Sequence, residues 1–489
     1  NTILPFAIII YYQLLMKLAL LHFYCLNRSF LSTLATKGCE LEFISLPAFA
    51  LQTLDKEYLF NLWPKCFLFD IASWNTTINL SSNQHDHYSL SPAEQLHVLL
   101  QSERLTHLKH LSIHQRTLLI DQQVLAANEL LSASRINRLA FGGVPHSMAD
   151  YVLCLIAKKM DITITIHQDL PMVKGNHFLY DQDLSLLIDR YDFDHMDYQD
   201  PVTLNNDQLE DDHYTPGKLK PREERLDYWA QTYAFLAQQG HQTIFDRLNE
   251  ILVENKLASQ AIEYYHRWQA YITTTSAELD PTLDVVFYLH VEPESVVNPT
   301  LGPEMPRQID FVRKLRSSLD VSIRLLVKEH PAMFLAAWSD SQLEYNFYRS
   351  DAFLQAISRL PNTYLIDAES LSSTFLDSTI TCASIMGTVH TEALCAGAPV
   401  IAAEVSPLKG MPGVHILSSK SPSNSINSNL IHHLRDDAAS LDKQSVLTHI
   451  KNRAQLGTPN GEMNMYYELD ENTLALNGKQ LALSIIRSS

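Results

Sequence analysis

The segment from Ser378 to Ile401 constrains the fold of this chain most strongly. It reads Ser-Thr-Ile-Thr-Cys-Ala-Ser, then Ile-Met-Gly, then a short helix-forming stretch, and finally Gly-Ala-Pro-Val-Ile. Two apolar runs, each bounded by glycine and joined through a short helix, indicate a strand–turn–helix–strand unit. Such units build parallel α/β sheets.

The start of that short helix suits a bound phosphate. Thr388 and Thr391 lie in its first turns, where backbone N–H groups are free and the helix dipole is positive. Glu392 follows directly, and a carboxylate at this place can accept hydrogen bonds from two vicinal hydroxyls, such as those of a ribose. An ordinary capped helix explains the same residues, and the segment alone does not choose between the two interpretations.

The second half of the chain alternates strands with helices. Strands are expected at 284–290, 322–328 and 363–366, with helices at 306–318 and 351–360. In a parallel sheet, ligands bind beyond the carboxyl ends of the strands. Polar side chains fall at these ends: His290, Glu292, Lys328, His330, Asp367, Ser384 and Thr388. Their convergence favours a binding site over a plain sheet.

The first half has the same alternation. Strands are expected at 17–24, 40–46, 138–141 and 162–166, and helices at 31–37, 91–102 and 148–160. Because 17–24 already forms a complete first strand, we expect Met16 to be the functional start and residues 1–15 to be a leader. Ile3 to Cys25 is apolar enough for a membrane anchor, but Lys17 lies inside that run.

Three regions follow from these patterns. Residues 16–200 form an N-terminal Rossmann-like domain, 201–280 an acidic linker with a helical segment, and 281–489 a C-terminal Rossmann-like domain with terminal helices. The aromatic residues of the helical segment are interpreted as helix packing, in preference to a ligand platform. The expected fold class is therefore α/β with two domains facing a cleft.

Charge and cysteine content exclude some classes of function. The formal net charge of −18 argues against a general nucleic-acid binder, which needs clustered Lys and Arg. The six cysteines form no C-x-x-C pair and lie mostly in apolar patterns, so they indicate reduced core residues of a cytoplasmic protein and neither disulfides nor a zinc site.

Several segments resemble the capsule and surface-polysaccharide glycosyltransferases of GT-B architecture. They are Tyr288–Glu294, Leu325–Pro331, Phe347–Arg349 and Gly387–Ile401, with weaker similarity around Pro145–Ser147 and Asp150–Val152. The pair His330-Pro331 also resembles the HP motif of bacterial sialyltransferases and Kdo transferases. The resemblance covers most of the chain and is specific only in the C-terminal half.

The resemblance implies roles for individual residues. His330 would contact the donor phosphate with Lys328 nearby, and Thr388 and Thr391 would hold phosphate at the helix start. Glu392 would hold the ribose. His290 and Glu292 would line the cleft towards the acceptor domain. The HP motif makes a CMP-sugar the favoured donor, ahead of a UDP-sugar.

The general base of such a transferase would come from the N-terminal domain. A carboxylate or imidazole must reach the acceptor hydroxyl, and Asp169 and His146 are the candidates. The segment His167–Pro171 departs from the family pattern, and His146 serves equally well as a helix cap. Asp192-Phe193-Asp194 and His85-Asp86-His87 are more simply solvated loops than metal sites. No metal or cofactor is expected.

The sequence thus predicts a glycosyltransferase that moves a sugar from a nucleotide donor to a polysaccharide or glycolipid acceptor. Its expected place is the cytoplasm, with room for peripheral association at the inner face of the membrane. Two alternatives remain open: a sugar-nucleotide 2-epimerase-like enzyme, and a non-catalytic nucleotide-sugar-binding component of polysaccharide assembly. Turnover with and without an acceptor separates all three.

Overall fold

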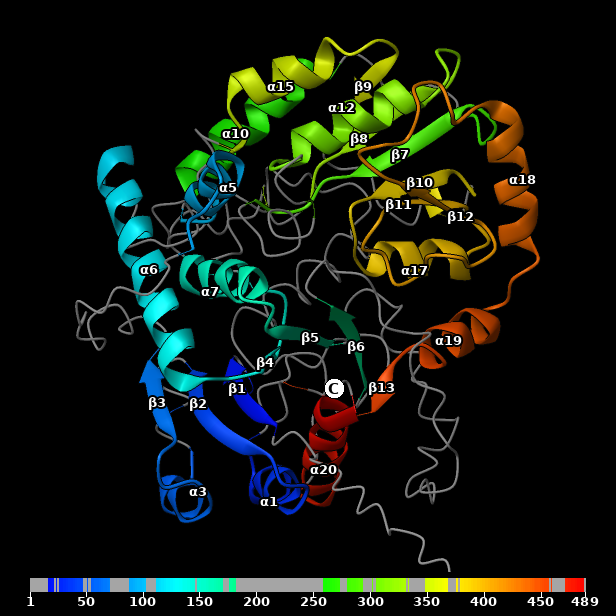
Figure 1. Ribbon diagram of the computed structural model, residues 1–489. Helices are drawn as coiled ribbons and strands as arrows, with labels where there is room; N and C mark the ends of the chain where they lie inside the picture. Colours follow the sequence, from blue (N-terminus) through cyan, green and yellow to red (C-terminus); the bar gives the residue numbers. More distant parts are fainter. Residues whose placement is uncertain are drawn as a thin grey trace, which may run out of the picture.

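The structure is a computed structural model of the 489-residue chain. It describes residues 16–21, 23, 26–46, 51, 54–70, 88–102, 111–145, 147–169, 176–181, 258–272, 279–292, 301, 305–330, 333, 348–367, 375–376, 379–456, 459 and 471–487. Two α/β units with largely parallel sheets make up these residues, one below the other in Figure 1. The predicted fold class is confirmed.

The first unit is built on a seven-stranded sheet, sheet A. Its order is β13-β6-β5-β4-β1-β2-β3. The strands are β1 (Lys17–Leu21), β2 (Glu40–Leu46), β3 (Phe67–Asp70), β4 (Arg138–Phe141), β5 (Thr163–Asp169), β6 (Asn176–Asp181) and β13 (Gln455–Leu456). The helices are α1 (Arg28–Thr36), α3 (Lys56–Leu62), α5 (Pro92–Ser102), α6 (Ile113–Ser134), α7 (Met148–Lys159) and α20 (Glu471–Arg487).

The second unit is built on a six-stranded sheet, sheet B, in which every pairing is parallel. Its order is β12-β11-β10-β7-β8-β9. The strands are β7 (Asp284–Tyr288), β8 (Arg324–Lys328), β9 (Thr363–Leu365), β10 (Thr381–Ser384), β11 (Val400–Ala403) and β12 (Val414–Leu417). The helices are α10 (Ala258–Tyr271), α12 (Gln308–Ser318), α15 (Asp351–Ser358), α17 (Thr388–Cys395), α18 (Ser428–Ala439) and α19 (Lys443–Lys451).

Local sequence explains where these elements begin. The Ser91-Pro-Ala-Glu94 pattern forms a capping box at the start of α5, because Ser91 N–H donates to Glu94 at 2.6 Å and Glu94 N–H donates to Ser91 Oγ at 3.3 Å. Alternate residues of β7 serve opposite faces of sheet B. Val285 and Phe287 pack towards α12, whereas Val286 and Tyr288 belong to the cluster that includes α17.

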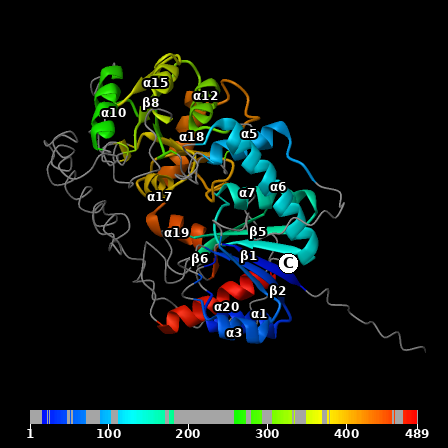
Figure 2. The ribbon, with the colours of Figure 1, turned by 90° about the vertical axis from the view of Figure 1, so that its left-hand side faces the viewer.

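The chain ends on the first unit. Figures 1 and 2 both place α20 beside α1, and Leu481 and Ile485 join the apolar cluster under sheet A. Arg138 also donates to the carbonyl of Ile485 at 3.1 Å. The edge strand β13 pairs antiparallel with β6. The terminal elements of the expected domain 281–489 therefore pack with the N-terminal sheet, a difference from the predicted assignment of these residues.

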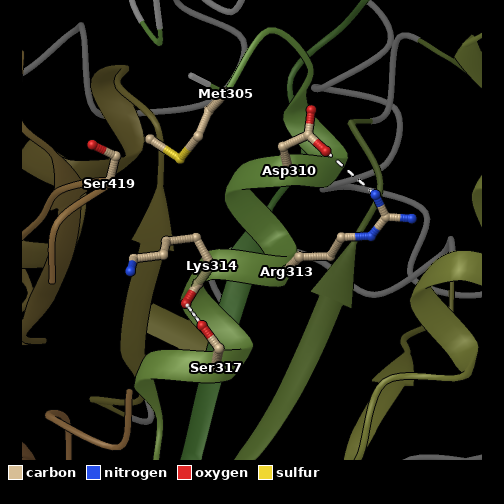
Figure 3. Close-up of a pocket in the computed structure, with 6 residues that line it drawn as sticks. All are labelled: Met305, Asp310, Arg313, Lys314, Ser317 and Ser419. Carbon is tan, nitrogen blue, oxygen red and sulfur yellow. Dashed lines mark hydrogen bonds and ion pairs between the residues drawn. The ribbon is translucent and has the colours of Figure 1, made fainter. Parts of the chain in front are cut away.

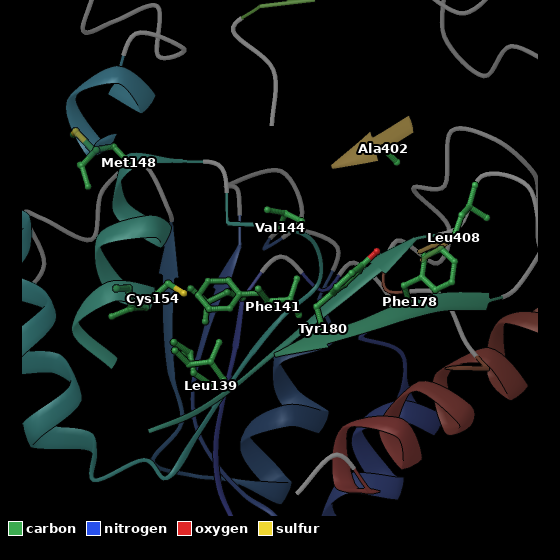
Figure 4. Packing of buried hydrophobic residues seen from close by; sticks show 14 of the residues in the cluster. Leu139, Phe141, Val144, Met148, Cys154, Phe178, Tyr180, Ala402 and Leu408 are labelled. Carbon is green, nitrogen blue, oxygen red and sulfur yellow. The ribbon is translucent and has the colours of Figure 1, made fainter. Parts of the chain in front are cut away.

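Apolar contact joins the two units. Leu408 and Met411, from the loop after β11, belong to the same buried cluster as Phe178 and Tyr180 of β6 (Figure 4). Most of the expected linker 201–280 lies outside the described residues, but α10 packs on the second unit. Its side chains Tyr264 and Trp268 are fully buried, so the aromatic residues described here are core residues, as predicted.

Two predictions fall on other parts of the chain. Residues 1–15, which were expected to be a leader, lie outside the described residues, as does Cys25. The five described cysteines are free thiols, four of them buried. Of the helices that the structure describes, none combines the length and the apolar character that crossing a bilayer demands.

Gly413 supports the packing of sheet B on α18. Its φ is +75°, and a Cβ here would lie 2.7 Å from Ala438 Cβ and 2.9 Å from Ala438 Cα. We expect Gly413→Ala to lower the free energy of unfolding by about 2–4 kcal/mol, through backbone strain and overpacking together. Gly38→Ala is the control, because Gly38 has φ +78° but no atom within 4 Å of the added Cβ. Equal losses in denaturant titrations of both variants would contradict this account.

Candidate functional site

The strand order of sheet B directs attention to one place. Connections leave in opposite directions from the neighbours β7 and β10, and ligands of such sheets bind beyond the carboxyl ends at this switch point. His290 follows β7 and Ser384 ends β10. The His290 Nε2 atom lies 3.0 Å from Ser384 Oγ, which also donates to the carbonyl of Tyr288 at 3.0 Å. The two strand ends are thus joined by side chains at the switch point.

Basic side chains gather around His290. Lys328 ends β8 and is only 2% exposed. Burial lowers the pKa of its ammonium to about 8, and the charge of Glu329 offsets part of that fall. His330 comes two residues later, and burial lowers the pKa of its imidazole to about 3, helped by His290 and Lys328. Within the described residues, no side chain forms an ion pair with Lys328.

His390 completes this group, which we call the basic cluster (His290, Lys328, His330 and His390). It lies in the first turn of α17 and is 1% exposed. Burial and the nearby His290 lower its pKa to about 3. Its Nε2 atom is buried with no hydrogen-bond partner in the described structure. A bound anion would offset these costs, because opposite charge favours the protonated forms.

The start of α17 faces the same region. Gly387 is its N-cap, with φ +131° and no side-chain cap hydrogen bond. A Cβ on Gly387 would lie 3.4 Å from His290 Cε1, so glycine permits the close approach of helix and imidazole. Thr388 follows, and it is exposed. The first-turn N–H groups of α17 therefore join the basic cluster as candidate phosphate ligands.

Thr391 and Glu392 lie deeper along α17. Thr391 is 1% exposed. Burial raises the pKa of the Glu392 carboxyl, although a hydrogen bond with the Thr388 side chain offsets part of that rise. Burial raises the pKa of the Tyr288 hydroxyl on the neighbouring strand, and Cys382 and Glu392 add to that rise. The hydroxyl is buried without a hydrogen-bond partner among the described residues. The Glu392 carboxylate and the Tyr288 hydroxyl thus lie near one another, one turn beyond the candidate phosphate ligands at the start of α17.

Glu292, which was predicted to line the cleft, belongs to a buried hydrogen-bond network. Its carboxylate is buried and accepts from Arg349 Nη1 at 2.6 Å and from Gln308 Nε2 at 3.1 Å. Glu292 therefore supports the turn after β7 in this structure. No role was predicted for Arg349 or for Glu329, the second carboxylate that holds it at 2.6 Å. The sequence feature that could have indicated a role for Glu329 is its position directly between Lys328 and His330.

The candidates for a general base lie apart from this cluster. Asp169 ends β5 of sheet A, is 6% exposed, and pairs across the strand with His177. His146 lies outside the described residues, next to Ser147, which caps α7. Gln168 stabilises the loop after β4, because its Oε1 accepts a hydrogen bond from Val144 N–H at 3.1 Å. The roles of Asp169 and His146 stay predictions.

Two hollows on the second unit border α12, and one of them also reaches Glu292 in the turn after β7. The other hollow, of about 530 Å³, lies along the outer side of α12, lined by Met305, Asp310, Arg313, Lys314, Ser317 and Ser419 (Figure 3). Its cations are already engaged, because Arg313 pairs with Asp310 and Lys314 donates to the carbonyl of Ser421. Among the described residues no group of His, Cys, Asp or Glu has the arrangement of a metal site. The Asp192–Asp194 and His85–His87 segments lie outside them.

Comparisons with known proteins give a remote structural likeness. No protein-family model matches the sequence, and no curated protein matches it either. The chain aligns with a UDP-GlcNAc 2-epimerase from Neisseria meningitidis bound to UDP-GlcNAc, at 10% identity and a TM-score of 0.20, covering 97% of this chain and 100% of that one. A Methanocaldococcus jannaschii UDP-GlcNAc 2-epimerase in complex with UDP-GlcNAc and UDP aligns at 10% identity and a TM-score of 0.23, with the same coverage.

The predicted site residues fall into two groups in the structure. Six of the nine predicted site residues are gathered at one end of sheet B or on α17: His290, Lys328, His330, Thr388, Thr391 and Glu392. Glu292 is engaged structurally, Asp169 belongs to sheet A, and His146 is not described.

Proposed function

We propose that the chain is an enzyme that binds a nucleotide-activated sugar at the switch point of sheet B. The observation that carries this proposal is the basic cluster. Lys328 and His390 are buried at the switch point, without an ion pair for Lys328 or a hydrogen bond for His390 Nε2 among the described residues. A phosphate would supply the missing negative charge and acceptors.

The remaining groups fit the rest of a ribonucleotide. The N–H groups at the start of α17 point to a phosphate site, and Glu392 lies one turn further along the helix. We propose that Glu392 accepts hydrogen bonds from the ribose hydroxyls. A CMP-sugar is the favoured donor, on the resemblance of His330-Pro331 to the HP motif, and a UDP-sugar comes next.

Glycosyl transfer is our first candidate reaction, with a polysaccharide or glycolipid as acceptor. It rests on the resemblance of the segments around His290, His330 and Gly387 to capsule transferases, and it requires a base from the N-terminal domain, for which Asp169 is the candidate. Transfer is complete only when the acceptor hydroxyl loses its proton. Peripheral contact with a membrane would follow from a lipid-linked acceptor.

Epimerisation at C2 of the sugar is the second candidate. It is the reaction implied by the names of the two solved structures above, and one feature of this chain favours it. A base for the C2 proton must lie in the donor site itself, and the pKa of Lys328, lowered to about 8, leaves roughly a tenth of that amine neutral at pH 7 while most of it stays an ammonium.

A two-step experiment tests the proposal. Thermal unfolding is measured with CMP-, UDP-, GDP- and dTDP-sugars, since a ligand of the folded state raises the melting temperature by mass action. The stabilising donor is then incubated without acceptor and followed by NMR. A new C2 epimer indicates epimerisation, and turnover only with an acceptor indicates transfer. Binding without turnover under either condition would leave a non-catalytic binding component, and no stabilisation by any donor would refute the proposal.

The ribose assignment gives a separate prediction. We expect Glu392→Gln to weaken a ribonucleotide by roughly 1.5–3 kcal/mol, the range for hydrogen bonds to charged groups, and to weaken the matching 2′-deoxynucleotide less. Glu404→Gln is a control, on another element of the same unit. Calorimetric titration with CMP and dCMP, and with UDP and dUDP, measures the difference. Equal losses for ribo and deoxy ligands would remove the assignment.

A further inference from the structure

A buried ion triad lies directly behind the basic cluster. The guanidinium of Arg349 is 0% exposed and lies between two carboxylates that are each 2% exposed. It donates through Nη1 to Glu292 at 2.6 Å and through Nε to Glu329 at 2.6 Å. We call Arg349, Glu292 and Glu329 the buried triad.

The buried triad contacts the backbone of both histidines that follow strand ends. Arg349 Nη2 donates to the carbonyl of His290 at 2.7 Å. Glu329 Oε1 accepts from the N–H of His330 at 2.7 Å. One side chain and its carboxylate partner therefore fix the backbone at the ends of β7 and β8, from which the two imidazoles project.

Neighbouring elements hold the triad in this position. Gln308, at the start of α12, accepts from His290 N–H at 2.6 Å and donates to Glu292 at 3.1 Å. Tyr264 of α10 donates its hydroxyl proton to Glu329. The network thus spans α10, α12 and the strand ends.

The charges of the triad do not cancel. One guanidinium and two carboxylates leave a net charge of −1 on the buried side of the cluster, and Glu329 is the carboxylate next to Lys328 in sequence. His330, on the same strand end, is near enough to Lys328, to His290 after β7 and to Arg349 before α15 for each of them to lower its pKa. His390 of α17 is coupled to His290 in the same way, and Tyr264 of α10 hydrogen-bonds Glu329. Glu329 favours the charged ammonium of Lys328, which burial opposes.

We propose that the buried triad holds the basic cluster in position and stabilises its positive charge. Arg349 and Glu329 are positioning residues, which hold the backbone of His290 and His330 and keep Lys328 in its ammonium form for an anionic ligand. This inference rests on the proposed function for the identity of that ligand, a nucleotide phosphate. The arrangement of the triad itself does not depend on which nucleotide or which reaction is involved.

Glu329→Gln is the informative variant, because it removes the charge and keeps the shape. Tyr264→Phe is the matched control, since it removes a hydrogen bond to the same carboxylate and leaves the charge in place. The rate of reductive methylation at Lys328 is followed by mass spectrometry between about pH 6 and pH 10, a range that spans its lowered and ordinary pKa values. This readout needs no nucleotide.

We expect the midpoint of the Lys328 profile near pH 8 in the unaltered chain. Glu329→Gln is expected to move it to lower pH by about one unit or more, the usual effect of losing an opposite charge at close range. Tyr264→Phe is expected to leave it in place. An unmoved midpoint in Glu329→Gln, or an equal shift in Tyr264→Phe, would overturn the inference.

A second arm separates this inference from the proposed function. CMP and UDP are titrated into the unaltered chain and into Glu329→Gln across the same pH range. Two results together support the inference and the proposed function: a nucleotide binds the unaltered chain, and its affinity for Glu329→Gln begins to fall at a lower pH than its affinity for the unaltered chain. If neither nucleotide binds the unaltered chain, the proposed function fails, while the methylation profile still decides whether the triad charges Lys328.

Discussion

Arg349→Ala is expected to lower the free energy of unfolding by about 3–5 kcal/mol, the range for breaking a buried ion pair on one side. The substitution leaves Glu292 and Glu329 facing one another in the interior, both 2% exposed, without their common cation. It also removes one of two side-chain donors to the His290 carbonyl, the other being Gln308 Nε2. Urea unfolding is followed by tryptophan fluorescence, to which Trp268 contributes from the core of the second unit and Trp63 from the core of the first.

Arg313→Ala is the control for this prediction. Arg313 also pairs with an aspartate, Asp310 at 3.3 Å, but its side chain is 53% exposed. Exposed ion pairs contribute between about 0 and 1 kcal/mol. A loss in Arg349→Ala no larger than that in Arg313→Ala would show that the buried triad does not hold sheet B together.

Lys328→Met is expected to separate stability from ligand affinity. The pKa of Lys328 is about 8 in the folded chain against an ordinary 10.5. The unfolded chain therefore binds more protons between these values, so this lysine contributes most to stability above pH 10.5 and loses that contribution as pH falls towards 8. At pH 7 methionine removes the cost of burying the charge, and stability should rise by up to about 3 kcal/mol.

Affinity for a nucleotide should change in the opposite direction. If Lys328 pairs with phosphate, its loss removes a charge-assisted hydrogen bond of about 1.5–3 kcal/mol, which is roughly a ten- to hundredfold weaker Kd. Lys314→Met, on the outer side of α12, controls for the loss of one positive charge. A more stable variant with unchanged affinity would show that Lys328 is a structural residue.

Much of the fold could be predicted from local patterns. The strand at 40–46 has the predicted bounds, and the helix at 351–360 ends two residues earlier than predicted, at Ser358. The expected strand 284–290 ends at Tyr288, because His290 turns out of the sheet to meet Ser384. Apolar periodicity and capping residues are local properties, so one sequence is enough to show them.

Local patterns could not predict which elements distant in the sequence pack together. The apolar face of α20 indicates burial, but nothing in 471–487 says that it packs on α1 instead of on sheet B. The antiparallel edge formed by β6 and β13 joins residues far apart in the chain. Periodicity shows that a face is buried without showing what covers it.

The candidate site shows the same division. Its residues could be located because the carboxyl ends of parallel strands share one edge, which brings Lys328 and Thr388 to the same region. The engagement of Glu292 could not be predicted, since its partner Arg349 is 57 residues away and no local rule pairs them. Charge compensation is a property of the folded core, and a sequence shows only the charges.

The proposed function requires that the basic cluster and the start of α17 hold a nucleotide phosphate. A crystal structure of the chain with a CMP- or UDP-sugar would show where the nucleotide binds. We expect phosphate oxygens within hydrogen-bond distance of Lys328 Nζ and of the N–H groups at the start of α17, with the ribose on Glu392. A nucleotide bound on sheet A, or in the hollow beside Lys314 on α12, would contradict it.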